Sequence, residues 1–417
     1  MIHQRKRLPS IAFVLVVMLI APVTGAVAAP MAARGQESDR SAVVRTWERI
    51  SIRTIFTERA TLIPVGALYL GFTSLAMYRA AQAAGAQHGS AEAAVAVAAH
   101  DVLAEYFPAS ATALDADLRA TLAALPPGRV TQRGEQAGDQ VASDLIVNRI
   151  GDGRDDTSIV YSRVAAPGVW PAQAPPPPGG MLVPWLGFVR PLLLDQPIRP
   201  RGVTGPDPLT GADYAADYDE VKRLGSLELS ARTARQTDTA LFFNSNSAIM
   251  IAEGVLRYLD AHPLSLTDTA RLFAAMHTAE GDAIITCWRL KYEVGFWRPF
   301  QAIHGADTDG NPATTPDPSW TPLIANPPYS DYVSGHGCLT SPTVQIIRRT
   351  LGENTPLRLH SYSTLIQRTD RDYRTLGAIE HDAFHARIWG GLHFRTAMED
   401  AYAIGHTAAD QVLHRLH

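Results

Sequence analysis

The chain lacks long runs of basic residues, and it lacks any sequence repeat of fixed period. Its 37 Lys and Arg residues are outnumbered by 41 Asp and Glu residues, which gives a formal net charge of −4. This composition argues against a nucleic-acid partner, because such proteins carry extended basic surfaces. With 417 residues, of which 46% are hydrophobic, the chain is long enough for one large domain or two modest ones.

Long apolar runs are also absent after the N-terminus. Residues 61–78 come closest, but Pro64, Gly66 and Gly71 interrupt them. We expect this segment to be buried and at least partly helical rather than to span a bilayer. The sequence therefore predicts no integral membrane domain.

The N-terminus itself has the pattern of a secretory signal. Residues 5–7 are basic, residues 11–21 form a short apolar core, and residues 26–28 are small enough for cleavage. We therefore assign residues 1–28 to a signal peptide and predict a secreted, extracytoplasmic protein. An uncleaved membrane anchor is the alternative, although the apolar core is short for a bilayer span.

Cysteine is scarce, with only Cys287 and Cys338 in the chain. Both fall among the motif residues described below. In an oxidising compartment they could form a disulfide bond. Two separate buried thiols are an equal alternative, because free cysteine often packs as a small hydrophobic residue.

Alternating strand patterns are sparse, whereas helical patterns dominate. Proline and glycine are too dense from 151 to 208 for regular elements, and we expect connecting loops there. The sequence therefore predicts an all-α fold whose C-terminal helical bundle carries the chemistry. We divide the chain into the signal peptide, an N-terminal helical region at 29–150, connecting loops at 151–217 and a C-terminal catalytic domain at 218–417. The main predicted helices are 72–84, 91–106, 113–124, 135–150, 238–261, 265–297, 334–351 and 393–414.

Lys291 and Arg298 are the first pair of candidate site residues. They lie seven positions apart, close to two helical turns, so we expect both on one helix face together with Trp288. Pro299 disfavours helical backbone at Arg298 and places that arginine at a helix end. A solvated basic face would explain Lys291 alone, but it explains the stripe with Trp288 poorly.

Ser334, Gly335 and His336 precede another predicted helix. Ser334 is a good N-cap, and Gly335 lets the backbone approach a ligand closely. The free N–H groups at a helix start favour anions. Taken alone, this triplet is better explained as an ordinary capped helix.

Arg387 and His393 flank the sequence Ile-Trp-Gly-Gly-Leu. The two glycines permit a tight turn, so the two side chains can converge. A neutral imidazole can offer its lone pair to phosphorus or to a metal centre. Together with the preceding residues, they supply three cations, a helix start and two imidazoles, which suits a tetrahedral oxyanion. Each charge-assisted hydrogen bond to such an anion contributes about 1.5–3 kcal/mol.

The three motifs resemble those of the vanadium-dependent haloperoxidases and the wider type 2 phosphatidic acid phosphatase superfamily. The similarity runs from Trp288 to Arg395, and Trp288 is similar to the haloperoxidase branch in particular. Upstream, residues 218–225 and 232–237 resemble secreted members of that branch. The resemblance implies a fold of helical bundles and small-molecule substrates.

The same resemblance implies a role for each motif residue. The equatorial oxygens of a vanadate cofactor, or of phosphate, would be held by Lys291, Arg298, Ser334, Gly335 and Arg387. His393 would bind vanadium axially or attack phosphorus. His336 would serve as the acid–base group on the opposite side.

The chain departs from the family pattern at two positions. Val333 stands where proline is usual, and Ala386 stands where a serine precedes the arginine. The missing hydroxyl at Ala386 affects the expected ordering around Arg387. Tyr329 lies near the position where halide preference is thought to be tuned. No upstream carboxylate is identified as a partner for His336.

Two enzymatic functions follow from the resemblance. In a haloperoxidase, His336 would accept a proton from hydrogen peroxide, and Lys291 would polarise the bound peroxide for attack by halide, with an organic acceptor downstream. In a soluble secreted phosphohydrolase, His393 would attack a phosphate ester and His336 would protonate the leaving oxygen. A degenerate member with a structural or binding role is a third hypothesis.

His381 and His385 form a possible zinc motif, because they stand at i and i+4 on a predicted helix near Asp382. No glutamate follows His381 in the His-Glu-x-x-His manner. We therefore interpret both as histidines on a helix surface.

Overall fold

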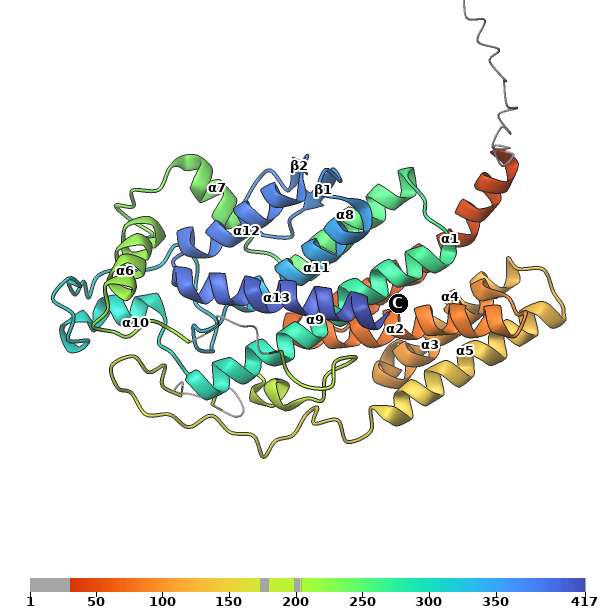
Figure 1. Ribbon diagram of the computed structural model, residues 1–417, viewed down its shortest axis with the longest axis horizontal. Coiled ribbons are helices and arrows are strands. Elements are labelled where there is room, and N and C mark those ends of the chain that lie inside the picture. Colours follow the sequence, from red (N-terminus) through yellow and green to blue (C-terminus); the bar gives the residue numbers. More distant parts are fainter. Residues whose placement is uncertain (1–30, 173–179, 199–202, 204, 417) are drawn as a thin grey trace, which may run out of the picture.

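The computed structural model describes residues 31–172, 180–198, 203 and 205–416. The described chain is largely helical and confirms the all-α prediction (Figure 1). The predicted signal peptide lies outside the described residues, so secretion stays a prediction. The α-helices are α1 (Met31–Ile52), α2 (Ile63–Ala86), α3 (Ala91–Tyr106), α4 (Ala111–Ala123), α5 (Arg129–Asn148), α6 (Ala212–Gly225), α7 (Ala234–Phe242), α8 (Ser247–Ala261), α9 (Leu266–Val294), α10 (Pro299–His304), α11 (Gly335–Leu351), α12 (Leu376–Trp389) and α13 (Arg395–Arg415).

The strands β1 (Leu357–His360) and β2 (Asp370–Tyr373) form one short antiparallel hairpin between α11 and α12, with Leu357 opposite Tyr373. Short π- and 3-10 segments complete the regular elements at Arg53–Glu58, Pro108–Ser110, Pro184–Phe188 and Ala306–Thr308. Part of the region predicted as loops is therefore helical, because α6 begins at Ala212.

Helix α2 confirms that the most apolar internal segment is buried. The helix starts at Ile63 rather than at residue 72, because Pro64 occupies the first turn, where its missing N–H group has no cost. Gly66 and Gly71 mark close packing rather than breaks: a Cβ atom at Gly71 would lie 3.0 Å from the carbonyl oxygen of His277. Within the described residues, no helix has both the length and the hydropathy needed to cross a bilayer.

Helix α9 organises the core. It packs against α2 on the side of the N-terminal helices, and against α11 and α13 on the side of the C-terminal helices (Figure 1). A single hydrophobic cluster extends from Val44 in α1 to Leu416 after α13. The predicted N-terminal region and the predicted catalytic domain therefore share one core, and the boundaries between them stay a prediction.

The helices near residues 31–52 and 238–261 differ from the predicted set. Helix α1 lies in a segment for which we predicted no individual helix. The predicted helix at 238–261 is two helices, because Asn246 caps α8 by accepting hydrogen bonds from the N–H groups of Ala248 and Ile249. Polar residues with short side chains stabilise helix starts in this way, so a helical pattern can run across a real break.

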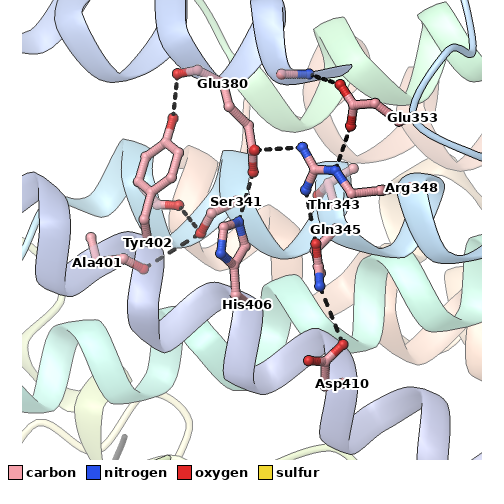
Figure 2. A network of polar contacts seen from close by, with 12 residues as sticks. Ser341, Thr343, Gln345, Arg348, Glu353, Glu380, Ala401, Tyr402, His406 and Asp410 are labelled. Atoms are coloured by element: carbon pink, nitrogen blue, oxygen red, sulfur yellow. Dashed lines mark hydrogen bonds and ion pairs between the residues drawn. The ribbon is translucent and has the colours of Figure 1, made fainter. Parts of the chain in front are cut away.

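A polar network connects the three helices that surround the motif residues (Figure 2). Arg348 of α11 contacts Glu380 of α12 at 2.6 Å and Glu353 at 2.6 Å. Glu380 also accepts a hydrogen bond from Nε2 of His406 in α13, at 2.7 Å. Gln345 extends the network to Asp410 of α13. Glu380 is therefore the point at which α11, α12 and α13 are held together.

We predict that Glu380→Gln lowers the free energy of unfolding at neutral pH by about 2 kcal/mol, because it weakens two charge-assisted hydrogen bonds. Burial raises the pKa of Glu380, but the hydrogen bonds from His406 and Arg348 outweigh burial and hold the pKa below its usual value. The stabilisation is therefore present above the unfolded-state pKa and is lost as the pH falls through the folded-state pKa. Urea denaturation of both proteins across that pH range tests this.

Glu293→Gln is the matched control, because its ion pair with Arg289 lies on an exposed helix surface. This control should change the free energy of unfolding by less than about 1 kcal/mol. Equal effects of the two substitutions, or a Glu380→Gln effect that persists at acidic pH, would contradict the prediction.

Candidate active site

Lys291 and Arg298 do not share a helix, and the prediction of one helix face was wrong. Helix α9 ends at Val294 because Gly295 adopts a left-handed conformation, with φ 58°, and donates its N–H to the carbonyl of Lys291. The boundary expected at Pro299 is confirmed: Arg298 has extended backbone and Pro299 opens α10. The chain turns between the two cations, and tertiary structure brings them back together.

Both cations are fully buried and are held by one segment of backbone. Lys291 Nζ donates to the carbonyl oxygens of Ser330 and Asp331 at 2.9 and 3.0 Å. Arg298 Nε donates to the carbonyl oxygen of Tyr329 at 2.9 Å, and its Nη1 donates to that of Leu392 at 2.8 Å. A solvated basic face is therefore excluded for Lys291.

The buried cations have more donors than the described residues satisfy. Arg298 Nη2 and Arg387 Nε have no hydrogen-bond partner within the described part of the chain. Burial lowers the pKa of Lys291 to about 8 and the pKa of Arg387 to about 10. Because uncompensated buried charge is costly, this arrangement is suited to an anionic ligand.

The glycine pair after α12 forms the predicted tight turn. Gly391 has φ 74°, and the N–H of Leu392 donates to the carbonyl of Arg387 at 3.0 Å. A Cβ atom at Gly391 would lie 2.6 Å from the carbonyl oxygen of Gly225, so a larger residue has no room there. Arg387 Nη1 reaches the carbonyl oxygen of Phe243 at 3.5 Å.

His393 is the point at which the motif side chains meet. Its Nε2 lies 3.1 Å from Arg298 Nη1, and its Nδ1 lies 2.7 Å from Asp331 Oδ1. Burial lowers the pKa of His393 well below its usual value, and the charges of Arg298, Lys291 and Arg387 lower it further. The imidazole is therefore neutral at physiological pH.

The two neighbours of His393 also select its tautomer. Nδ1 faces a carboxylate, which can only accept unless it is protonated, and Nε2 faces a guanidinium, which can only donate. The proton therefore belongs on Nδ1, and the lone pair belongs on Nε2.

Asp331 is the functional residue that the sequence analysis missed. It is fully buried, and burial raises its pKa to about 7 although the charges of Arg298 and Lys291 oppose that rise. It is also the only acidic residue between Asp317 and Glu353. A single acidic residue three positions before Ser334 was the available signal. A loop sequence has no periodicity, however, from which to infer where the Asp331 side chain points.

The Ser334 motif forms a capped helix start, as predicted. Ser334 Oγ accepts the N–H of Gly337 at 3.3 Å, and a Cβ atom at Gly335 would lie 3.2 Å from the Trp288 ring. His336 Nε2 lies 3.1 Å from the carbonyl oxygen of Ser245. Burial lowers the pKa of His336 to about 3, with the charge of Arg387 as a further cause. Its hydrogen-bond partner is thus a backbone carbonyl between α7 and α8.

Aromatic rings form one wall of the site. Trp288 donates its indole N–H to the carbonyl oxygen of Leu182 at 3.1 Å and packs against Tyr329, with ring centroids 5.1 Å apart. The Tyr329 ring lies 4.8 Å from Lys291 Nζ and 4.9 Å from Arg298 Cζ. These rings cover the buried cations and exclude water from them.

Cys287 and Cys338 are both free and buried, so the structure contains two thiols rather than a disulfide bond. Cys287 Sγ donates to the carbonyl oxygen of Val333 at 3.4 Å, and Cys338 Sγ approaches that of Ala401 at 3.9 Å. Ala386, directly before Arg387, is fully buried, and as an alanine it supplies no side-chain hydroxyl there.

The remaining histidine pair does not join the motif residues. The rings of His381 and His385 lie 4.3 Å apart on α12, and His385 Nδ1 lies 2.8 Å from the carbonyl oxygen of its partner. The His381 side chain is 62% exposed. No group of three candidate metal-ligating side chains occurs among the residues that the structure describes.

Comparison with known proteins relates this arrangement to one group. Residues 271–417 match the family model of the VCPO second helical-bundle domain. The vanadium chloroperoxidase of Curvularia inaequalis is 28% identical over 173 residues, which cover 34% of this chain and 28% of that protein. The match to this relative thus spans less than a third of its length.

Solved structures match over a larger share of the chain. The first bacterial vanadium-dependent iodoperoxidase aligns with a TM-score of 0.68 and 19% identity, covering 92% of this chain and 96% of the other. The apo-type bacterial vanadium-dependent chloroperoxidase aligns with a TM-score of 0.64 and 17% identity, covering 85% and 93%. At these identities the similarity establishes the shared fold.

We predict that sulfate binds at this site and that its affinity falls as the pH rises through about 8, where Lys291 loses its proton. Sulfate remains a dianion in this range, so the ligand itself does not titrate. Lys291→Gln should weaken binding by about tenfold near pH 7 and remove the decrease around pH 8. Isothermal titration calorimetry between about pH 6 and pH 9 measures both effects.

Lys222→Gln is the control, because Lys222 is the other lysine among the described residues and lies on α6. It should leave both the affinity and its pH dependence unchanged. A decrease around pH 8 that survives in Lys291→Gln would assign the titration to another group.

Proposed function

Because the chain belongs to the superfamily of vanadium haloperoxidases and type 2 phosphatidic acid phosphatases, we propose that it is a vanadium-dependent haloperoxidase, which oxidises halide with hydrogen peroxide. One observation carries the proposal: the neutral Nε2 of His393 lies among buried cations whose donors are incompletely satisfied. An oxyanion whose central atom can also accept a nitrogen ligand would match both features.

The donor set fits vanadate. Lys291, Arg298 and Arg387 would hold its oxygens together with the start of α11, and His393 would supply the nitrogen ligand. Arg298 Nη2 and Arg387 Nε lack hydrogen-bond partners among the described residues, and Arg298 Nη1 lies 3.1 Å from His393 Nε2, so one ligand would satisfy both the charge and the coordination. Bound vanadate would supply a Lewis acid that activates peroxide without redox cycling.

We assign proton transfer to His336. Its pKa near 3 keeps the imidazole neutral at physiological pH, so it can accept a proton when hydrogen peroxide enters. A negatively charged ligand beside it would raise that pKa and strengthen it as a base. Lys291, fixed by two backbone carbonyls, would polarise the bound peroxide.

The aromatic wall and the related structures support the haloperoxidase over the alternative. Trp288 lies against Tyr329 and against the start of α11, so the site is shielded from bulk water. The structural neighbours that match most of the chain are named as an iodoperoxidase and chloroperoxidases.

A soluble phosphohydrolase is the second candidate, favoured by the same neutral Nε2 of His393. That atom could attack a phosphate ester and form a phosphohistidine, while His336 protonates the leaving oxygen. The backing carboxylate of Asp331 would stabilise the positive charge that develops on the imidazole. Both candidates therefore use the same residues on different ligands.

A paired assay of one purified sample separates the two functions. We expect bromination or iodination of an organic acceptor when vanadate and hydrogen peroxide are present, and little hydrolysis of an aryl phosphate without vanadate. His393→Ala should abolish halogenation, whereas His262→Ala, at an exposed position just after α8, should retain it. Robust phosphate release with no halogenation at any pH would replace the first proposal with the second.

Asp331→Asn tests how His393 is positioned. Above the pKa of Asp331, which burial raises to about 7, the substitution removes a negative charge near the anion, so sulfate should bind at least as tightly as it binds to the unmodified protein. Vanadate-dependent halogenation should nevertheless fall by about 10–100-fold, because the partner that orients the imidazole is lost. Calorimetry and initial rates measured on the same preparations supply the two readouts.

Asp400→Asn is the matched control, since Asp400 accepts a hydrogen bond from Tyr332 and contacts none of the motif side chains. Its halogenation rate should remain within about twofold of the unmodified protein. A parallel loss of sulfate binding and halogenation in Asp331→Asn would indicate a structural role for that carboxylate.

A further inference from the structure

A second concentration of positive charge lies outside the candidate active site. A cavity of about 730 Å³ opens between α7, the β1–β2 hairpin and α12, which lie close together in Figure 1. Arg235, Arg368 and Arg374 line it. We refer to these three residues and the cavity that they line as the arginine basin.

The acidic residues of the basin are already engaged. Each of the three acidic residues contacts another residue of the described chain: Asp238 contacts Arg371, Asp372 contacts Arg358, and Asp382 contacts Tyr373. None of these three contacts involves Arg235, Arg368 or Arg374.

Arg235, Arg368 and Arg374 form no hydrogen bond or ion pair within the described part of the chain. Other surface arginines are commonly paired, as Arg223 is with Asp219 and Arg289 is with Glu293. Three unpaired guanidinium groups around one cavity repel one another, and an anion in the cavity relieves that repulsion. The chain as a whole has a net charge of −4, so general basicity does not explain the cluster.

Flat rings form the floor of the basin. Tyr373, His381 and Trp389 line the same cavity. His385 stacks on Trp389 at 5.3 Å between ring centroids and fixes the indole in place. A planar organic group can stack on such rings while its anionic groups meet the arginines.

The basin shares a wall with the candidate active site. The Tyr373 ring lies 6.3 Å from the Phe243 ring, and the carbonyl oxygen of Phe243 accepts the hydrogen bond from Arg387 Nη1. Trp389 follows Arg387 by two positions on α12. A molecule in the basin therefore lies one layer of residues from the anion site.

We propose that the arginine basin binds a planar organic molecule with two or more negative charges, and that such molecules are the acceptors that the enzyme halogenates. The second half of the proposal rests on the proposed function. Hypohalous acid would transfer X⁺ to a ring carbon of the acceptor: the C–X bond forms as the O–X bond breaks, the C–H bond then breaks, and the released proton joins the hydroxide to give water.

The binding half is tested with pyrene-1,3,6,8-tetrasulfonate, a fluorescent planar anion, by anisotropy on the protein without vanadate or peroxide. The triple variant Arg235→Gln, Arg368→Gln and Arg374→Gln should weaken binding by at least about a hundredfold at low salt. Circular dichroism should show unchanged folding, because all three side chains are exposed.

Two single variants serve as controls for this measurement. Arg129→Gln removes an exposed, unpaired arginine at the start of α5, far along the chain from the basin. Lys291→Gln removes charge from the candidate active site. Neither should change binding of the probe. Equal affinity of the triple variant and the unmodified protein, or loss of binding in Lys291→Gln, would overturn the basin as the site.

The acceptor half is tested by competition between 5-hydroxyisophthalate and its dimethyl ester, which share a ring and differ in charge. For the unmodified enzyme, we divide the kcat/KM for bromination of the diacid by the kcat/KM for the ester. This ratio should be at least about tenfold above the diacid-to-ester ratio obtained with hypobromous acid in solution. The triple variant should return to the solution ratio while its rate with the ester is unchanged. If the unmodified enzyme gives the same diacid-to-ester ratio as hypobromous acid in solution, the acceptor role is overturned. If no halogenation occurs at all, binding of the fluorescent probe still tests the basin as a binding site.

Discussion

The contact between Arg298 and His393 is the constraint on which the site depends. It places a buried cation 3.1 Å from the nitrogen that must keep its lone pair. The cation, together with burial, keeps the imidazole neutral, and Asp331 on the other ring nitrogen fixes the tautomer. Each of these effects needs the others, because a protonated imidazole beside buried cations would add uncompensated positive charge.

Backbone carbonyls make the close contacts to the buried cations, whereas the carboxylate oxygen Oδ1 of Asp331 lies 4.0 Å from Arg298 Nη1. Residues Tyr329, Ser330 and Asp331 present their carbonyl oxygens to Lys291 and Arg298. Carbonyl dipoles orient a cation without neutralising it, so its full charge remains available to an anionic ligand. This explains why the segment before α11 is irregular and buried. Its carbonyl oxygens accept hydrogen bonds from Lys291 and Arg298 rather than from a neighbouring strand.

Sequence reasoning predicted the helical fold, the capped start of α11 and the tight turn at Gly391, because each depends on local chemistry. It failed where a distant partner decides the structure. Gly295 ends α9 four residues after Lys291, so the two-turn spacing to Arg298 had no structural meaning. Asp331 and the carbonyl of Ser245 act through tertiary contacts that no periodic pattern encodes.

Helix α12 lies between the candidate active site and the arginine basin. Arg387 lies on its buried side, with the guanidinium held near Phe243, and His381 lies on its exposed side, at the arginine basin. The helix is fixed to α11 and α13 through Glu380, so its two faces keep a constant relation (Figure 2). Positive charge on both sides of this helix would give the proposed anionic acceptor a place close to the candidate active site without opening that site to water.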